Sequence, residues 1–213
     1  MRSIAVVVHA EAVHHIERVI GGWHDSQLTE RGERQAHRAA LALARSFSAP
    51  HVPVVTSDLR RARQTAEIIA GTLASGLTVH PGFRELSYGV AEGRPKAWLD
   101  ERIVPVPTAG SRLDHRICEG AESRRDLATR VYAAMAEVLA PDAGDAVIVT
   151  HGFAATFVIA CWIGMPIEST GLVSFASSPA GFSLLVEDAP FMNRRVQCLN
   201  DTRHLEQVEQ DPS

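Results

Sequence analysis

The sequence contains little cysteine, and the placement of that cysteine excludes the usual cysteine-based sites. Only three cysteines occur in 213 residues, and they stand far apart. Zinc and redox sites need closely spaced cysteine pairs, and a disulfide-rich secreted chain normally has an even number. We therefore expect three reduced thiols with structural roles at Cys118, Cys161 and Cys198.

Long hydrophobic runs and an excess of basic residues are also missing. No apolar run approaches the roughly eighteen residues that span a bilayer. The short apolar run of "MRSIAVVVHAE" lacks the small-residue cleavage site of a secretory signal. A formal net charge of −4 argues against general nucleic-acid binding, which needs a basic face. We therefore expect a cytoplasmic protein with neither a membrane nor a nucleic-acid partner.

The remaining composition and the hydrophobic pattern indicate a globular α/β protein. Hydrophobic residues make up 46% and charged residues 22% of the chain, and the length fits one domain over residues 1–213. Alternating strands and helices predict a three-layer α/β/α fold with a mainly parallel central sheet. Thr29 is a plausible N-cap of the first helix, and Gly76 follows the second. The periodicity predicts strands at 4–8, 52–57 and 145–150 and helices at 28–47, 57–76, 122–140 and 153–164.

Two regions depart from this alternation. Residues 81–121 include Pro81, Pro95, Pro105 and Pro107 and have little periodicity, so we interpret them as an irregular or partly helical excursion that forms a lid over a site. Near the end, the runs 171–177 and 181–188, separated by "SPA", predict a hairpin that leads to a last strand around 195–200. The tail 206–213 is expected to fray.

Polar residues follow three of the predicted strands at the point where each strand ends. The first strand ends at His9, the second precedes Arg60 and Arg61, and the third ends at His151 and Gly152. Ligands of open parallel sheets bind outside the carboxyl ends of the strands, so we expect these groups to converge. Imidazoles can act as nucleophiles or bases, and guanidinium groups bind anions. Two histidines with arginine therefore favour phosphoryl transfer over acyl transfer.

Several blocks of sequence resemble one known family over nearly the whole chain. They are "GWHDSQLTERGERQA" (22–36), "SDLRRARQTAEIIA" (57–70), "RELSYGVAEGR" (84–94), "AESRRDLATRV" (121–131) and "VTHG" (149–152), followed by "LNDTRHL". The sequence thus resembles the histidine phosphatase superfamily, which includes cofactor-dependent phosphoglycerate mutase and many small-molecule phosphatases. This resemblance implies a phosphoglycerate mutase-like fold, a phosphorylated small-molecule substrate and no metal or other cofactor. A homodimer is compatible with it.

The resemblance also implies roles for individual residues. His9 would be the nucleophile that takes the phosphoryl group, and Glu85 would be the general acid that protonates the leaving oxygen. Arg61 and His151 would hold phosphate oxygens beside His9. The substrate-binding candidates are His15, Arg60, Tyr88 and Gly152, although Arg60 is a neighbour that more often faces outward and Tyr88 could instead pack the excursion.

The first block departs from the family's pattern. The family has arginine, histidine, glycine and glutamate where this chain has Val8, His9, Ala10 and Glu11. The missing arginine is a phosphate clamp in the family, and removing one charge-stabilising donor typically costs about 100- to 1,000-fold in rate. His15 also stands where the family commonly has asparagine.

Three interpretations follow from this departure. In the first, which we favour, the protein is a slow or specialised phosphatase in which another basic group supplies the missing charge. In the second, it no longer transfers phosphate and uses the same pocket for ligand binding or a different acid–base reaction. In the third and least favoured, His9, Glu11, His14 and His15 bind a metal, although their spacing matches no familiar ligand pattern. The basic candidates for the first interpretation are His14, His15, Arg18, Arg102, Arg112 and Arg116.

Other positions separate hydrolysis from phosphoglycerate mutation. Mutases carry an arginine after the catalytic glutamate, where this chain has Leu86, and a serine where it has Gly21. Hydrolysis is therefore favoured. Trp23 with Asp25 is expected to fix the loop that enters the first helix. Asp126 and Arg130, four residues apart on a predicted helix, are expected to form a surface ion pair.

Overall fold

A six-stranded sheet forms the centre of the molecule. The computed structural model describes residues 2–49 and 51–206, and its strand order is β3-β2-β4-β1-β5-β6. The strands β3, β2, β4 and β1 are parallel, whereas β5 is antiparallel to both of its neighbours. The predicted mainly parallel sheet is confirmed. Its strands are β1 (Arg2–Val8), β2 (Val54–Thr56), β3 (Leu77–Val79), β4 (Ala146–Thr150), β5 (Phe182–Glu187) and β6 (Arg194–Asp201).

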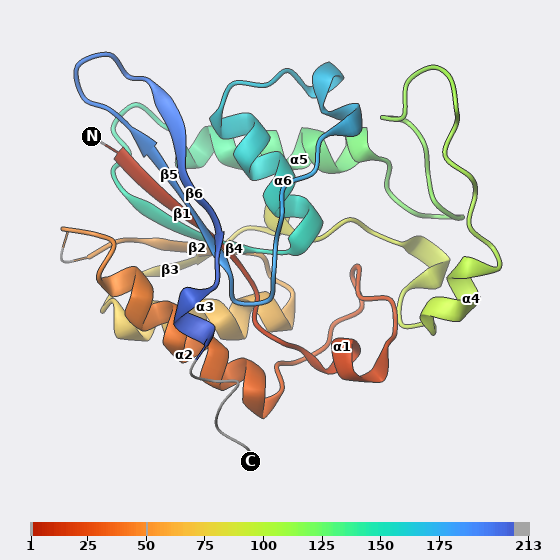
Figure 1. Cartoon of the computed structure of the whole chain (residues 1–213), viewed down its shortest axis with the longest axis horizontal. Coiled ribbons are helices and arrows are strands. Elements are labelled where there is room, and N and C mark those ends of the chain that lie inside the picture. Colours follow the sequence, from red (N-terminus) through yellow and green to blue (C-terminus); the bar gives the residue numbers. More distant parts are fainter. Residues whose placement is uncertain (1, 50, 207–213) are drawn as a thin grey trace.

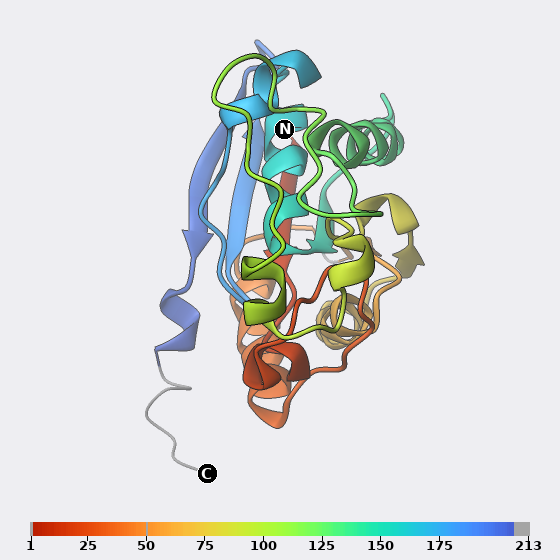
Figure 2. The same ribbon diagram turned by 90° about the vertical axis from the view of Figure 1, so that its right-hand side faces the viewer.

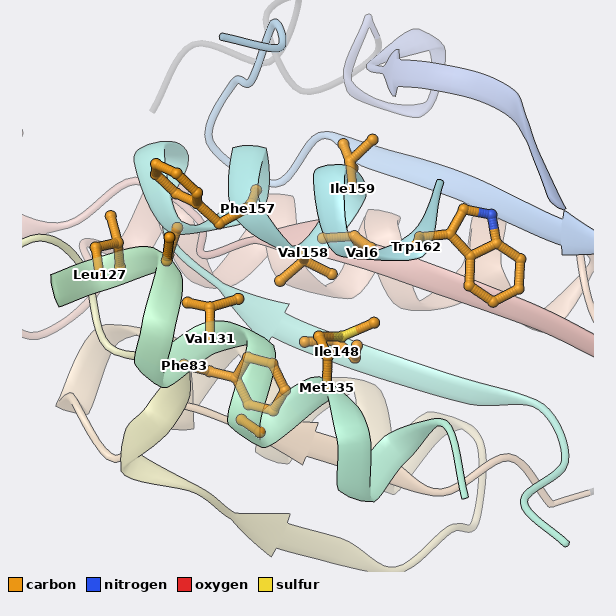
Figure 3. Packing of buried hydrophobic residues seen from close by; sticks show 14 of the residues in the cluster. Val6, Phe83, Leu127, Val131, Met135, Ile148, Phe157, Val158, Ile159 and Trp162 are labelled. Carbon is orange, nitrogen blue, oxygen red and sulfur yellow. The ribbon is translucent and has the colours of Figure 1, made fainter. Parts of the chain in front are cut away.

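Helices cover both faces of the sheet, which confirms the three layers (Figure 1). Alternate residues of β1 point to opposite faces. Ile4, Val6 and Val8 pack in the cluster on the α5 and α6 side, whereas Ala5 and Val7 pack in the cluster on the α2 and α3 side. Figure 3 shows the first cluster, in which side chains of α5 and α6 meet Val6 and Ile148 of the sheet. The helices are α1 (Val13–Glu17), α2 (Glu30–Ala44), α3 (Arg60–Thr72), α4 (Lys96–Asp100), α5 (Arg124–Val138) and α6 (Gly152–Trp162).

The expected end of α3 is wrong. Gly76 does not close this helix; α3 ends at Thr72, and the left-handed residue that follows is Ala74, with φ 48°. Ser75 N then donates to Ala70 O, which satisfies a free carbonyl of the last turn. The chain turns early because residues 77–79 form the edge strand β3, which the sequence reading missed. The N-terminus of α2 agrees with the prediction: Thr29 caps this helix, since its side-chain oxygen accepts a hydrogen bond from Gly32 N.

The expected hairpin near the chain end is also wrong in its first half. Residues 171–177 do not form a strand, and the antiparallel pair consists of β5 and β6. The backbone of the first run bonds to helix side chains instead of a ladder: Phe175 N donates to Thr156 Oγ1, and Arg124 donates to Val173 O. Alternating exposure along this run therefore arises from packing against α5 and α6. The tail that was expected to fray lies outside the described residues from 207 on.

The first half of the excursion 81–121, up to α4, lies over the carboxyl ends of the strands as expected, whereas the second half runs back along the 3₁₀ turn η3 (Ile167–Leu172) (Figure 2). The excursion contains α4 and the 3₁₀ turns η1 (Pro81–Phe83) and η2 (Gly89–Ala91). Backbone hydrogen bonds join the excursion to the segment after α1, so this part of the excursion is held in place. Ile20 N donates to Arg94 O at 2.8 Å, Gly93 N to Ile20 O at 2.9 Å and Lys96 N to Arg18 O at 3.2 Å.

The expected ion pair between Asp126 and Arg130 does not form. Arg130 makes two bonds to Glu122 and donates to the carbonyls of Gly82, Arg84 and Glu85. Asp126 instead accepts from Ser123 as part of a capping box and pairs with Arg116. Helical spacing allowed the contact, but the carbonyls of residues 82–85 provide Arg130 with more acceptors. Arg130 therefore fixes the start of the excursion.

The three cysteines form no disulfide in the described part of the chain. Cys118, Cys161 and Cys198 are free, and Cys118 is buried. Within residues 2–49 and 51–206, no helix has the length and apolarity that crossing a membrane requires.

Candidate active site

A cavity of about 500 Å³ lies at the carboxyl edge of the sheet. Residues that follow β1 and β4 form its floor, and α1, its following loop and the excursion form its walls. Polar and apolar side chains both line the cavity. The polar ones include His9, His14, His15, Arg61, Glu85, Lys96, Asp100, Ser177 and Ser178, and the apolar ones include Val8, Val19, Ile20, Leu99, Ile103 and Ile117.

His9 lines the cavity directly after β1. Its ring is buried, and its Nδ1 lies 2.8 Å from Ala10 O. Arg61 Nε donates to His9 Nε2 at 3.1 Å, and because a guanidinium has no acceptor, Nε2 must carry the lone pair. His9 is therefore the neutral tautomer with its hydrogen on Nδ1. Burial, followed by the charge of Arg61, holds the pKa of His9 well below its usual range.

Arg61 joins His9 to the loop after α1. It stands in the first turn of α3 and is 1% exposed. Besides its bond to His9, it donates from Nη1 to His24 O at 2.8 Å and from Nη2 to Gly22 O at 2.6 Å. Burial lowers the pKa of Arg61 to about 10, so it remains charged at neutral pH. Because a guanidinium has five N–H groups, donors remain for an anion.

His151 follows β4 and precedes the first residue of α6. Its ring centroid lies 5.1 Å from that of His9, and the ring is fully buried. Neither ring nitrogen has a hydrogen-bond partner among the described residues. Burial and the nearby charge of Arg61 hold the pKa of His151 well below its usual range. A buried neutral imidazole with a free N–H suits the binding of an anionic oxygen beside His9.

Glu85 lies at the N-terminus of α6. Its Oε2 accepts from Phe153 N at 3.0 Å, and its Oε1 accepts from Ala154 N at 3.1 Å and from Leu86 N at 2.8 Å. Burial raises the pKa of Glu85 in spite of these three donors. Trp23 Nε1 donates to the Glu85 carbonyl at 2.7 Å, which fixes the backbone. Glu85 is thus a positioned carboxyl group with a strengthened tendency to hold a proton.

His14 and His15 bring two more imidazoles to the cavity from α1. Their ring centroids are 4.0 Å apart, and the His15 ring stacks 5.5 Å from that of His9. His14 Nδ1 lies 2.6 Å from Ser26 Oγ, and burial lowers the pKa of His14 to about 3. His15 Nδ1 accepts from Ala12 N, so the neutral ring carries its hydrogen on Nε2. At neutral pH these rings supply N–H donors but no positive charge.

The structure brings three of the four expected metal-ligand candidates together. Ring nitrogens of His9, His14 and His15 lie within 4.8 Å of one another. Glu11 is turned away, since its carboxylate binds Thr29 and Arg31. An N–H group already occupies the lone pair of His9 Nε2 and that of His15 Nδ1. A metal at this cluster would compete with these bonds and face the positive charge of Arg61, so the metal interpretation stays the least favoured.

The other expected residues divide into two groups. Tyr88 and Gly152 line the cavity, whereas the exposed side chain of Arg60 does not. The backbone of Arg60 instead helps to hold the loop before α2, because the Arg60 N–H donates to Asp25 Oδ1 at 2.7 Å. The sequence reading missed Lys96, an exposed residue that lines the rim. Its signal in the sequence was weak, since it is a lone lysine in an irregular segment. The expected replacements Arg18, Arg102, Arg112 and Arg116 do not line this cavity.

Comparisons with known proteins agree on one family. Residues 4–192 match the model of the histidine phosphatase superfamily (branch 1). The probable phosphoglycerate mutase GpmB of Enterobacter sp. (strain 638) is 36% identical over 169 residues, which cover 78% of this chain and 77% of the relative. The corresponding protein of Yersinia enterocolitica is 37% identical over 169 residues, with the same coverage.

Solved structures share the fold. The mycobacterial glucosyl-3-phosphoglycerate phosphatase in complex with VO3 has a TM-score of 0.77 at 24% identity, covering 95% of this chain and 100% of that protein. Bacillus stearothermophilus YhfR has a TM-score of 0.76 at 21% identity, covering 97% and 100%. The predicted phosphoglycerate mutase-like fold is thereby confirmed.

The buried histidines make folding stability depend on pH. The pKa of His14 is about 3 in the folded chain, against 6.5 for an unperturbed imidazole. Below pH 6.5 the unfolded chain therefore binds more protons, so this contribution is complete above pH 6.5 and is lost as the pH falls toward 3. His14→Gln should reduce the slope of unfolding free energy between pH 6 and 4 by up to about 1.4 kcal/mol per pH unit.

Urea unfolding of the wild type and the variant across this pH range measures the difference. The exposed His37 provides the matched control His37→Gln, which should keep the wild-type slope. Equal slopes for all three proteins would show that His14 titrates alike in the folded and unfolded chains.

Proposed function

Because this chain belongs to the histidine phosphatase superfamily, we propose that it hydrolyses a small phosphomonoester through a phosphohistidine at His9. One observation carries the proposal: His9, Arg61 and Glu85 line the same cavity, His9 Nε2 carries a lone pair beside Arg61, and the buried His151 ring centroid lies 5.1 Å from that of His9. A nucleophile, anion-binding donors and a positioned acid are the parts that phosphoryl transfer requires. The relatives named probable phosphoglycerate mutase and glucosyl-3-phosphoglycerate phosphatase support a phosphorylated substrate.

In the first step, His9 Nε2 attacks phosphorus while the bond from phosphorus to the leaving oxygen breaks. The bond of Arg61 Nε to His9 must give way, so that this N–H turns to a phosphate oxygen. Glu85 transfers its proton to the leaving oxygen and becomes a carboxylate. The raised pKa of Glu85 suits this role, because the acid must be protonated before the transfer.

In the second step, water attacks the phosphohistidine. The Glu85 carboxylate takes a proton from that water, the phosphorus–nitrogen bond breaks, and inorganic phosphate leaves. His9 returns to the neutral tautomer that its contact with Ala10 O favours. Glu85 gives a proton to the leaving oxygen and regains one from water, and His9 and water are the two nucleophiles, so we expect the reaction to need no metal or other cofactor.

Val8 supports a slow or specialised reaction. Its side chain is buried, packs with the α5 and α6 cluster, and lines the cavity beside His9. Phosphate would therefore meet an apolar surface at this position, with Arg61 and the rim residue Lys96 as the cations of the cavity. Neutral N–H donors of His15 and His151 bind phosphate oxygens less strongly than a guanidinium does.

The apolar surface that Val8 presents to the cavity also favours a second candidate function. The buried imidazoles of His9, His14 and His151 and the exposed imidazole of His15 could serve ligand binding or an acid–base reaction without phosphate. We rank this candidate below hydrolysis, because Arg61 and Glu85 retain the positions that phosphoryl transfer uses.

His9→Ala should abolish hydrolysis of a panel of phosphomonoesters, since no other lone pair replaces Nε2. Wild-type protein quenched during turnover of ³²P-labelled substrate should carry acid-labile, base-stable label at His9, detected by mass spectrometry. His37→Gln should retain both turnover and label. Turnover that survives His9→Ala would overturn the assignment of the nucleophile, and absence of turnover across the panel would favour the second candidate.

Glu85→Gln should have an effect that depends on the leaving group. Alkyl phosphates need a proton on the departing oxygen, so their kcat should fall by about 100-fold or more. Hydrolysis of 4-nitrophenyl phosphate, whose leaving group is stable as an anion, should fall by less than about tenfold. Equal losses for both substrates would contradict the role of Glu85 as the general acid.

Val8→Arg should raise kcat/KM for 4-nitrophenyl phosphate by about 10- to 1,000-fold, because it adds a guanidinium beside His9. The cavity of about 500 Å³ has room for the longer side chain. Val8→Met controls for added length without charge and should leave the rate near that of the wild type. If Val8→Arg folds normally and stays slow, a missing cation is not what limits the rate.

A further inference from the structure

A second, smaller cavity of about 280 Å³ lies next to the first. Tyr88 and Ile117 line both cavities and form the boundary between them. We propose that this second cavity binds a carboxylate carried by the organic part of the substrate. That the ligand is part of a phosphate ester rests on the proposed function. The binding of a carboxylate in this cavity does not depend on turnover.

Arg124 provides the first observation. It is the first residue of α5, and its Nε is buried without a hydrogen-bond partner among the described residues. Its Nη2 donates to the carbonyls of Thr170 and Val173, and its guanidinium carbon lies 4.7 Å from the centre of the Phe153 ring. These contacts hold the side chain in place but supply no negative charge.

Arg112 provides the second observation. It lines the same cavity as Arg124, from the loop after α4. Burial, followed by the charge of Arg112, lowers the pKa of Arg124. Neither arginine forms an ion pair within the described part of the chain. Glu122, the one acid on this cavity wall, is already engaged by two bonds from Arg130. Two like charges without a counter-ion repel each other, and an anion between them would relieve that repulsion.

The position of the cavity links it to the leaving group. Two of its lining residues are direct neighbours or bonding partners of Glu85: Leu86 follows it, and Phe153 N donates to its Oε2. Glu85 is the group proposed to protonate the leaving oxygen, so the organic part of the substrate departs along this side. A substituent that extends past Tyr88 and Ile117 would reach Arg112 and Arg124.

The chemistry of the walls selects the ligand class. Guanidinium groups bind carboxylates through parallel N–H donors. The cavity is small; besides the two arginines and the polar side chains of Tyr88, His115 and Glu122, its walls are apolar, with Leu86, Val106, Ile117 and Phe153. We therefore infer a phosphate ester of an alcohol or phenol that has an apolar body and a carboxylate at its far end.

Hydrolysis of a matched substrate pair tests the inference. Wild-type protein should have a higher kcat/KM for 4-carboxyphenyl phosphate than for 4-carbamoylphenyl phosphate, which has the same shape without the charge. Arg112→Gln should lower this preference by about tenfold through loss of one charge-assisted contact, while leaving the rate with phenyl phosphate unchanged. Arg102→Gln is the matched control, since Arg102 is exposed on the same excursion and lines neither cavity. Equal preference in the wild type and in Arg112→Gln would overturn the proposal.

A binding measurement separates this inference from the proposed function. Benzoate titrated by NMR should shift resonances of Phe153 and Ile117 in wild-type protein and equally in His9→Ala, in which hydrolysis is abolished. The shifts should weaken in Arg112→Gln and in Arg124→Gln, with benzamide as the uncharged control ligand. Because Arg124 also bonds to residues 170 and 173, the exposed Arg112 provides the decisive variant. If benzoate binds but no phosphomonoester is hydrolysed, the carboxylate site is supported and the phosphatase proposal is overturned. If phosphomonoesters are hydrolysed but benzoate does not bind, the carboxylate site is overturned and the phosphatase proposal is supported.

Discussion

The buried guanidinium of Arg61 is the interaction on which the site depends. It joins three separate parts of the chain: its own helix α3, His9 at the end of β1, and the carbonyls of Gly22 and His24 in the loop after α1. Removing a buried charge from water is costly unless fixed dipoles replace the solvent. Here two carbonyls and an imidazole lone pair provide that replacement. The same contacts fix the tautomer of His9, so one side chain determines both the shape and the protonation state of the site.

The elements with strong local signals could be predicted from the sequence. The apolar strands β1 and β4, and the helix α2 with its Thr29 cap, follow directly from residue pattern. The convergence of His9, Arg61 and His151 followed from the rule that ligands bind at the carboxyl ends of parallel strands. The strand β3 was not predicted, and the strand predicted at 171–177 does not form. β3 has three residues, too few for a periodic signal, and residues 171–177 alternate in exposure because helices, not a neighbouring strand, cover one side.

The candidate site was predictable in its residues but less so in its electrostatics. Sequence spacing could not show that Arg130 bonds to Glu122 and to carbonyls of residues 82–85 instead of pairing with Asp126. Nor could it show that burial would leave His14 and His15 uncharged, since both were candidates for the missing positive charge. Such outcomes depend on desolvation and on acceptors from distant segments. Lys96 was missed for the same reason, because only the folded excursion brings it to the rim.

The join between the excursion and the segment after α1 consists of main-chain hydrogen bonds at Ile20, Gly93 and Lys96. Since these bonds involve no side chains, they restrict residue type mainly at Gly93, whose φ of 70° favours glycine. The side chains that α4 presents to the cavity, among them Lys96 and Leu99, can therefore change during evolution while the wall keeps its position relative to His9. A candidate site of constant geometry is thus combined with a wall whose residues can change, so substitutions in α4 would alter which ligands fit the cavity.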